Sequence, residues 1–229
     1  MKRYLILLLF ISTSYSQTNF QFDYFLEYNF TNHIDSTKSE KVFYLTNSED
    51  NSYYVKITEK DSLNFRLLFI KQDHLYSDVK IFKKGFYKGE IINIDCNNIK
   101  ALSNKYKFQA ENYEMIKDTD SSNISFYKFI CLRSEKYIKK NKIGFNIIKF
   151  NTKLPFHLPN LYHMTFYENW KKEKNLPNNF IIENAFYDYN KNLIWTESLI
   201  NYSKTTTKIN ILIKECDEIY LKEIIKIKQ

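Results

Sequence analysis

Glycine and proline are scarce in this chain of 229 residues, which contains three of each beside three cysteines and two tryptophans. So few glycines exclude a collagen helix, low-complexity linkers and glycine-rich phosphate-binding loops. No long apolar run is present either, which excludes a polytopic membrane protein. Aromatic residues, in contrast, make up 17% of the chain. The composition therefore predicts a globular protein with an aromatic core.

Motifs that carry enzymatic chemistry are also missing. The chain has no nucleophile elbow, no H-E-x-x-H, no P-loop and no dinucleotide-binding fingerprint. Its cysteines and histidines lack the spacing of a structural zinc site, and His157 and His163 are interpreted as loop or surface histidines. Closely spaced acidic residues are interpreted as surface charge; they are Glu111 and Glu114, Asp118 and Asp120, and Glu215, Asp217 and Glu218. The sequence thus predicts no catalytic, cofactor-binding or metal-binding residue, and a protein that is not an enzyme.

The amino terminus has the three parts of a secretory signal peptide. Positive charge at Lys2 and Arg3 precedes the apolar run of residues 4–11, and small residues follow at Ser14 and Ser16. Eight apolar residues are too few to span a bilayer as a helix. We therefore predict cleavage between Ser16 and Gln17, leaving residues 17–229 as a single β-rich domain that is secreted or periplasmic and not transmembrane once mature.

Alternation of apolar and polar residues with a period of two dominates the mature part. In residues 22–30, five apolar side chains fall on one face, with Phe25 as the exception, as expected for a half-buried strand. Turns rich in Asn, Asp and Ser separate such runs, for example residues 118–123. Further strands are expected at 41–46, 53–58, 65–70, 75–82, 89–94, 105–110, 124–132, 143–150, 180–187, 193–200 and 208–214. This pattern predicts a mainly β fold: an antiparallel meander, sandwich or open half-barrel with one or two short helices.

The segment from Leu154 to Asn178 departs from this pattern and contains all three prolines. Asn160 could cap a helix that begins at Leu161, with lysines in the last turn. An edge strand is the competing interpretation, and the alternation in this segment does not decide between them.

Two residue types suggest specific contacts. The three cysteines Cys96, Cys131 and Cys216 allow one disulfide in three possible pairings, and the sequence does not choose between them. A disulfide between Cys96 and Cys131 would stabilise the fold by roughly 3–4 kcal/mol, and three unpaired thiols are the alternative. The sequence around Cys131 indicates a core residue. Trp170 and Trp195 could stack on a ligand such as a sugar ring, although a tryptophan in an amphipathic segment more often belongs to the core.

Several segments resemble those of secreted proteins of unknown function from Bacteroidota-type bacteria. They are Ser16-Gln17, the residues 22–28, the residues 47–55, and Leu176-Pro177 with the residues 186–193. In style the chain is similar to the GLPGLI-type proteins, although the Gly-Leu-Pro-Gly-Leu-Ile motif is absent and residues 158–161 do not replace it. The resemblance implies a secreted or periplasmic β-rich protein and carries no site residue with it.

These observations favour a non-enzymatic, exported β-rich protein of the cell envelope. The alternative is a periplasmic carrier that binds a lipid or other hydrophobic ligand in a half-barrel groove, closed by residues 154–178. A third hypothesis is a hydrolase of envelope polymers. The net charge of +8 could attract an anionic envelope surface, whereas predicted export and the presence of only three arginines argue against nucleic acid as a partner.

Overall fold

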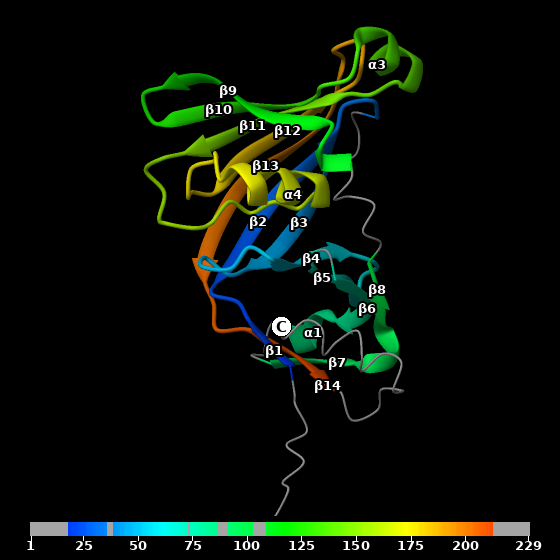
Figure 1. The fold of residues 1–229 in the computed structure, drawn as a ribbon. Helices are drawn as coiled ribbons and strands as arrows, with labels where there is room; N and C mark the ends of the chain where they lie inside the picture. Colours follow the sequence, from blue (N-terminus) through cyan, green and yellow to red (C-terminus); the bar gives the residue numbers. More distant parts are fainter. Residues whose placement is uncertain (1–17, 36–38, 73, 87–90, 103–108, 213–229) are drawn as a thin grey trace, which may run out of the picture.

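An open, antiparallel sheet of eleven strands dominates the computed structural model, which describes residues 18–35, 39–72, 74–86, 91–102 and 109–212 (Figure 1). The strands in spatial order are β8 (Ile99–Ala101), β6 (Leu75–Phe82), β5 (Asn64–Lys71), β4 (Tyr53–Glu59), β3 (Ser39–Thr46), β2 (Tyr24–Asn32), β13 (Leu193–Lys204), β12 (Ile181–Tyr187), β11 (Phe145–Asn151), β10 (Ile124–Cys131) and β9 (Tyr113–Ser121). The mainly β, open fold predicted from the alternation is confirmed.

Two meanders meet at the centre of this sheet. Strands β2 to β6 follow one another as neighbours through short turns, and β9 to β13 also follow one another as antiparallel neighbours. In the second series, α3 lies between β10 and β11, and residues 152–180 with α4 lie between β11 and β12. The long pairing of β2 with β13 joins the two halves, with Phe30 opposite Glu197 and Asn32 opposite Trp195. Strands from near the two ends of the described chain therefore lie side by side in the middle of the sheet.

A second, three-stranded sheet covers one face of strands β3 to β6. It consists of β1 (Thr18–Gln21), β14 (Lys208–Leu212) and β7 (Ile91–Asp95), with the short helix α1 (Lys83–Phe86) nearby (Figure 1). Phe25 stacks on Phe43 on this face, their ring centroids 5.4 Å apart, and also contacts Phe86. Phe25 departs from the alternation because the second face of β2 also has apolar packing at this position.

Helix α4 (Met164–Glu173) lies in the concave side of the large sheet (Figure 1). It lies within the segment that the sequence left open between helix and edge strand. The prediction that Asn160 caps this helix at Leu161 is wrong. The cap is His163, whose Nδ1 accepts a hydrogen bond from the Thr165 backbone N–H at 3.3 Å. Lys174 ends the helix in the left-handed conformation. Phe166 and Trp170 pack from α4 onto strands β9 to β11, so the helix roofs the carboxyl-terminal half of the sheet.

Two elements escape the alternation rule. Residues 118–121, predicted as part of a turn, continue β9 to the edge of the sheet, and the turn begins only at Ser122. The outer half of this strand is solvent-exposed, so charged pairs such as Lys128 with Asp118 replace the apolar pattern that would have revealed it. Helix α3 (Glu135–Asn141), which follows β10, is likewise exposed, and its signals are a Ser134 cap and an ion pair between Glu135 and Lys139.

The disulfide expected between Cys96 and Cys131 is wrong. Cys131 is a buried free thiol at the end of β10, whereas Cys96 is disulfide-bonded and opens the 3-10 turn η1 (Cys96–Asn98) after β7. β10 and β7 lie at opposite ends of the molecule (Figure 1). The third cysteine, Cys216, lies outside the described residues, as do the predicted signal peptide and its cleavage site at Ser16 and Gln17.

We expect alkylation of the unfolded, unreduced protein to modify Cys131 and to spare Cys96. Alkylation of the folded protein should leave Cys131 unmodified, because its side chain is buried in the sheet. Peptide mapping by mass spectrometry measures both, and Cys131→Ala serves as the control that removes the label. Modification of Cys96 before reduction would contradict this assignment.

Candidate functional site

A cavity of about 610 Å³ lies between the large sheet and α4 with the segment that precedes it. Its lining comes from both meanders and from the turn after α3. The lining residues are Tyr28, Phe30, Tyr44, Lys56, Gln109, Tyr113, Phe129, Asn141, Lys142, Ile143, Gly144, Asn146, Asn160, Tyr162, His163, Thr165, Phe166, Ile181, Asn184, Phe186, Trp195 and Glu197. A volume of this size is typical of sites for small molecules, which fall roughly between 300 and 1,000 Å³.

Aromatic rings from neighbouring strands form one wall of the cavity. Phe186 of β12 and Trp195 of β13 are directly opposite in the register and stack with centroids 5.7 Å apart. On the other side of β13, the ring centroid of Phe30 in β2 lies 5.9 Å from that of Trp195. Inward-facing residues on adjacent strands are cross-strand neighbours. The inward-facing rings of β2, β13 and β12 therefore form one continuous apolar strip of Phe30, Trp195 and Phe186.

Tyrosines line the part of the cavity next to this strip. The rings of Tyr44 and Tyr162 stack almost parallel, with centroids 3.6 Å apart and an interplanar angle of 8°. Tyr28 meets Tyr44 edge-on at 5.5 Å. Burial raises the pKa of both the Tyr28 and the Tyr44 hydroxyl above the usual value of 10.0, so both hydroxyls keep their protons at neutral pH.

Side-chain donors on the sheet hold the segment that carries Tyr162 in place. Asn51 donates to the Pro159 carbonyl at 2.9 Å and Gln72 donates to the Leu161 carbonyl at 2.7 Å. The Tyr54 hydroxyl donates to the carbonyl of Tyr162 itself at 2.8 Å. This irregular segment is therefore fixed by buried hydrogen bonds, which satisfy the carbonyl groups that no strand pairing occupies.

Asn160 connects this segment to two strands at once. Its Nδ2 donates to the Tyr28 hydroxyl at 2.8 Å and to the Tyr162 hydroxyl, and its Oδ1 accepts from the Ile181 backbone N–H at 3.0 Å. The Tyr28 hydroxyl in turn donates to the Ile181 carbonyl at 2.6 Å. Asn160 thus has the central position in a buried network beside the cavity, which explains why it cannot cap α4.

Glu197 is the one carboxylate among the described residues that line the cavity. Its side chain is 6% exposed, and its Oε1 accepts a hydrogen bond from the Tyr44 hydroxyl at 2.7 Å. Burial raises the pKa of Glu197, while the positive charge of Lys56 and the Tyr44 hydrogen bond oppose that rise. The cavity therefore combines aromatic walls with one buried acidic group, a combination suited to holding an amphipathic molecule.

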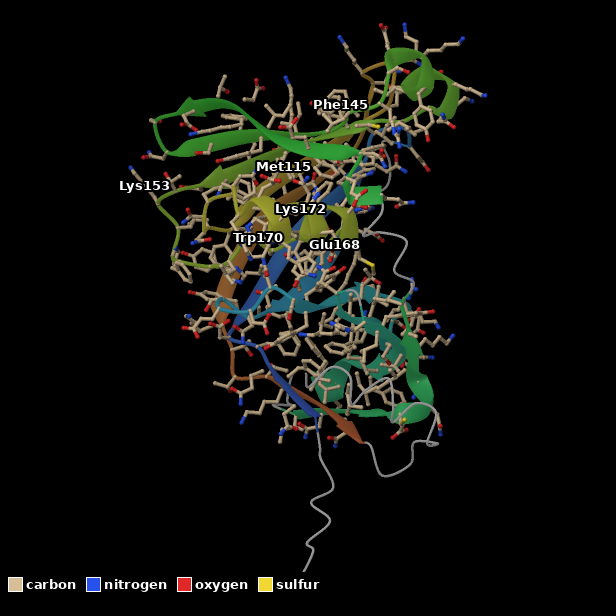
Figure 2. The ribbon with its side chains drawn as sticks, viewed as in Figure 1. Met115, Phe145, Lys153, Glu168, Trp170 and Lys172 are labelled. Carbon is tan, nitrogen blue, oxygen red and sulfur yellow. The ribbon has the colours of Figure 1, made fainter. Side chains whose placement is uncertain are left out.

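The two tryptophans proposed as ligand contacts have different positions. Trp195 lines the cavity. Trp170, labelled on α4 in Figure 2, is 5% exposed in the core cluster that also contains Met115, and the Lys174 ammonium lies 3.5 Å from its ring centroid. The structure thus brings one of the two to the candidate site.

The two histidines flanking the proline-rich segment are not equivalent. His157, interpreted as a loop or surface histidine, is fully buried, with its Nε2 2.8 Å from the Thr46 hydroxyl. The surface interpretation is wrong because the rings of Tyr24 and Phe180 enclose it. His163 caps α4 at the edge of the cavity. Among the described residues, no group of three or more His, Cys, Asp and Glu side chains could hold a metal ion.

Sequence reasoning missed Glu197, although a signal was present. Along β13, Trp195, Glu197 and Leu199 share one face of the strand, so the alternation places a carboxylate in phase with two apolar residues. A charge on an otherwise apolar face is rare unless it has a partner or a function.

Comparisons with known proteins add a likeness of shape alone. No family model matches the chain, and no curated protein matches it. Among solved structures, the chain is similar to a domain from Vibrio parahaemolyticus provisionally described as an outer membrane lipoprotein-sorting protein domain. The TM-score is 0.25 and the sequence identity 8%, with 89% of this chain and 91% of that chain covered. A TM-score this low assigns neither a family nor a function. Within the described residues, no helix is long and apolar enough to cross a bilayer.

Proposed function

We propose that this protein is a non-enzymatic binding protein of the cell envelope, and that it holds one small amphipathic molecule in the cavity between α4 and the large sheet. The observation that carries the proposal is the cavity itself, with its aromatic strip and the Tyr44–Glu197 pair beside that strip. The amino-terminal pattern of charged, apolar and small residues supports export to the compartment in which such a carrier would act.

Hydrolysis is the less favoured function for this cavity. Glycoside hydrolysis generally requires two carboxyl groups, one as acid and one as base or nucleophile, on either side of the scissile bond. Glu197 has no second carboxylate beside it among the described lining residues. A single buried carboxylate that already accepts a tyrosine hydrogen bond is better suited to ligand binding than to acid–base chemistry.

The two tryptophans provide the test, because only Trp195 lines the cavity. We expect an uncharged alkyl glycoside with bromine on its tail to quench the fluorescence of Trp170→Phe, in which Trp195 is the remaining tryptophan, in a saturable manner. Heavy-atom quenching requires near contact, so the same titration of Trp195→Phe, in which Trp170 remains in the core, should change little. Equal quenching of both variants, or quenching of neither, would contradict binding in this cavity.

A further inference from the structure

The Glu197 carboxylate has only part of the coordination that a buried charge needs. The Tyr44 hydroxyl donates to Oε1, and no other described side chain donates a hydrogen bond to the carboxylate. No lysine or arginine of the described residues forms an ion pair with it within 4.0 Å. Glu197 is 6% exposed, and its second oxygen, which accepts from no described side chain, is not sealed from the cavity that Glu197 lines. A carboxylate with so little access to water is stabilised by a partner of opposite charge that enters the cavity.

The surroundings of Glu197 favour a positive partner. Phe30 is its cross-strand neighbour, and the stacked rings of Tyr44 and Tyr162 lie beside it in the same cavity. The faces of aromatic rings carry negative charge density and attract cations, most strongly where water is excluded. A buried carboxylate beside aromatic rings is an arrangement by which proteins bind protonated and quaternary amines.

The nearby cation Lys56 does not take this place. It lies opposite Tyr44 in the register of β3 and β4, and its Nζ is 5.7 Å from the centroid of the Tyr44 ring. At that position it acts on Glu197 over a distance and helps to keep the carboxylate ionised. Lys56 therefore does not occupy the carboxylate of Glu197.

We propose that Glu197 binds the positively charged nitrogen of the ligand, so that the molecule held in the cavity is an amphiphile with a protonated or quaternary amine at its head. The Tyr44 and Tyr162 rings contact the headgroup, and the apolar part lies along the strip of Phe30, Trp195 and Phe186. This assignment rests on the proposed function, since it names the chemistry of the ligand in the same cavity.

Three probes with the same twelve-carbon tail separate the headgroup from the tail: dodecyltrimethylammonium, dodecyl maltoside and dodecyl sulfate. Calorimetric titration of the full-length mature protein, below the micelle concentration of each probe, measures the three affinities. We expect the cation to bind about tenfold or more tightly than the maltoside, as expected for one charge-assisted contact. In Glu197→Gln, which can still accept from Tyr44, this preference should disappear.

Glu183→Gln is the matched control. Glu183 is one residue before Asn184 in β12 but is on the opposite face of the strand, where it pairs with Lys149 at 2.6 Å. The substitution Glu183→Gln removes the same charge without changing the cavity, so the preference for the cation should remain. If circular dichroism shows that Glu197→Gln does not fold, the ranking of the three probe affinities on the unmodified protein still tests whether the cavity prefers a cationic headgroup.

The outcomes also separate the two proposals. Equal binding of the cation and the maltoside, tighter binding of the sulfate, or an unchanged preference in Glu197→Gln would overturn the amine assignment and leave the binding function intact. Absence of binding for all three probes would overturn both.

Discussion

Replacement of Asn160 by alanine is expected to lower the free energy of unfolding by about 3 kcal/mol, because buried groups lose their partner simultaneously. The Ile181 N–H loses its acceptor, and the Tyr28 and Tyr162 hydroxyls lose the donor they share. The Ile181 N–H and the Tyr28 hydroxyl have little access to bulk water, since Ile181 is 3% exposed and Tyr28 is 1% exposed. Urea unfolding monitored by circular dichroism measures the loss.

Asn179→Ala is the control for this substitution. Asn179 lies on the same segment, but its side chain makes one hydrogen bond, to the Leu154 carbonyl at 3.0 Å, and is only partly buried. Its removal should cost about 1 kcal/mol. Asn160→Ala should also weaken binding of the alkyl probes, since Tyr162 loses one of its anchors. If Asn160→Ala were as stable as Asn179→Ala, the hydrogen bonds of Asn160 would not be what fixes the segment that carries Tyr162.

The second large effect is expected on acidification, through His157. Burial lowers the pKa of His157 to about 4, from 6.5 for an exposed imidazole. The unfolded chain therefore binds a proton at a higher pH than the folded protein does. Between pH 6.5 and pH 4 the unfolded state carries more protons, so the free energy of unfolding falls as the pH falls. The neutral His157 makes its full contribution to the free energy of unfolding above pH 6.5. About 3 kcal/mol of that free energy is lost by pH 4.

Urea unfolding at pH 7 and at pH 4 tests this expectation in the unmodified protein and in His157→Gln. The carboxylates with lowered pKa values, such as Asp78 beside Arg66, also destabilise the fold in acid. They are present in both proteins, so their effect cancels in the comparison. His157→Gln should lose about 3 kcal/mol less than the unmodified protein between the two pH values. The exposed His33→Gln should behave like the unmodified protein, and an equal loss in all three would contradict a buried neutral His157.

Most of the large sheet could be predicted from the sequence because its strands are half-buried. Strand β6 occupies the predicted residues 75–82, and most other strands differ from the predicted bounds by a few residues. Strands β1, β8 and β9 and helix α3 have no counterpart among the predicted elements, and most of β9 and all of α3 are exposed or only half-buried. Two-period alternation reports burial, so a strand exposed at the sheet edge gives no such signal.

The candidate site was less predictable because it depends on contacts between distant residues. Asn160 followed by Leu161 has the local appearance of a helix cap, yet its partner Tyr28 is 132 residues away. Trp195 could be named from its residue type alone. Glu197 could not be separated from the other acidic residues of the chain, 26 in total, before the pairing of β2 with β13 placed it beside Phe30.

Native mass spectrometry of the mature protein purified from the cell envelope tests the central claim most directly, since it detects what the cavity holds. We predict one bound amphiphile per chain, released on denaturation and recovered in the lipid extract. Asn184→Trp, which projects a large side chain into the cavity from β12, should lose that mass while keeping its β-sheet signal in circular dichroism. An empty unmodified protein, or a bound mass that persists in Asn184→Trp, would contradict a binding function for this cavity.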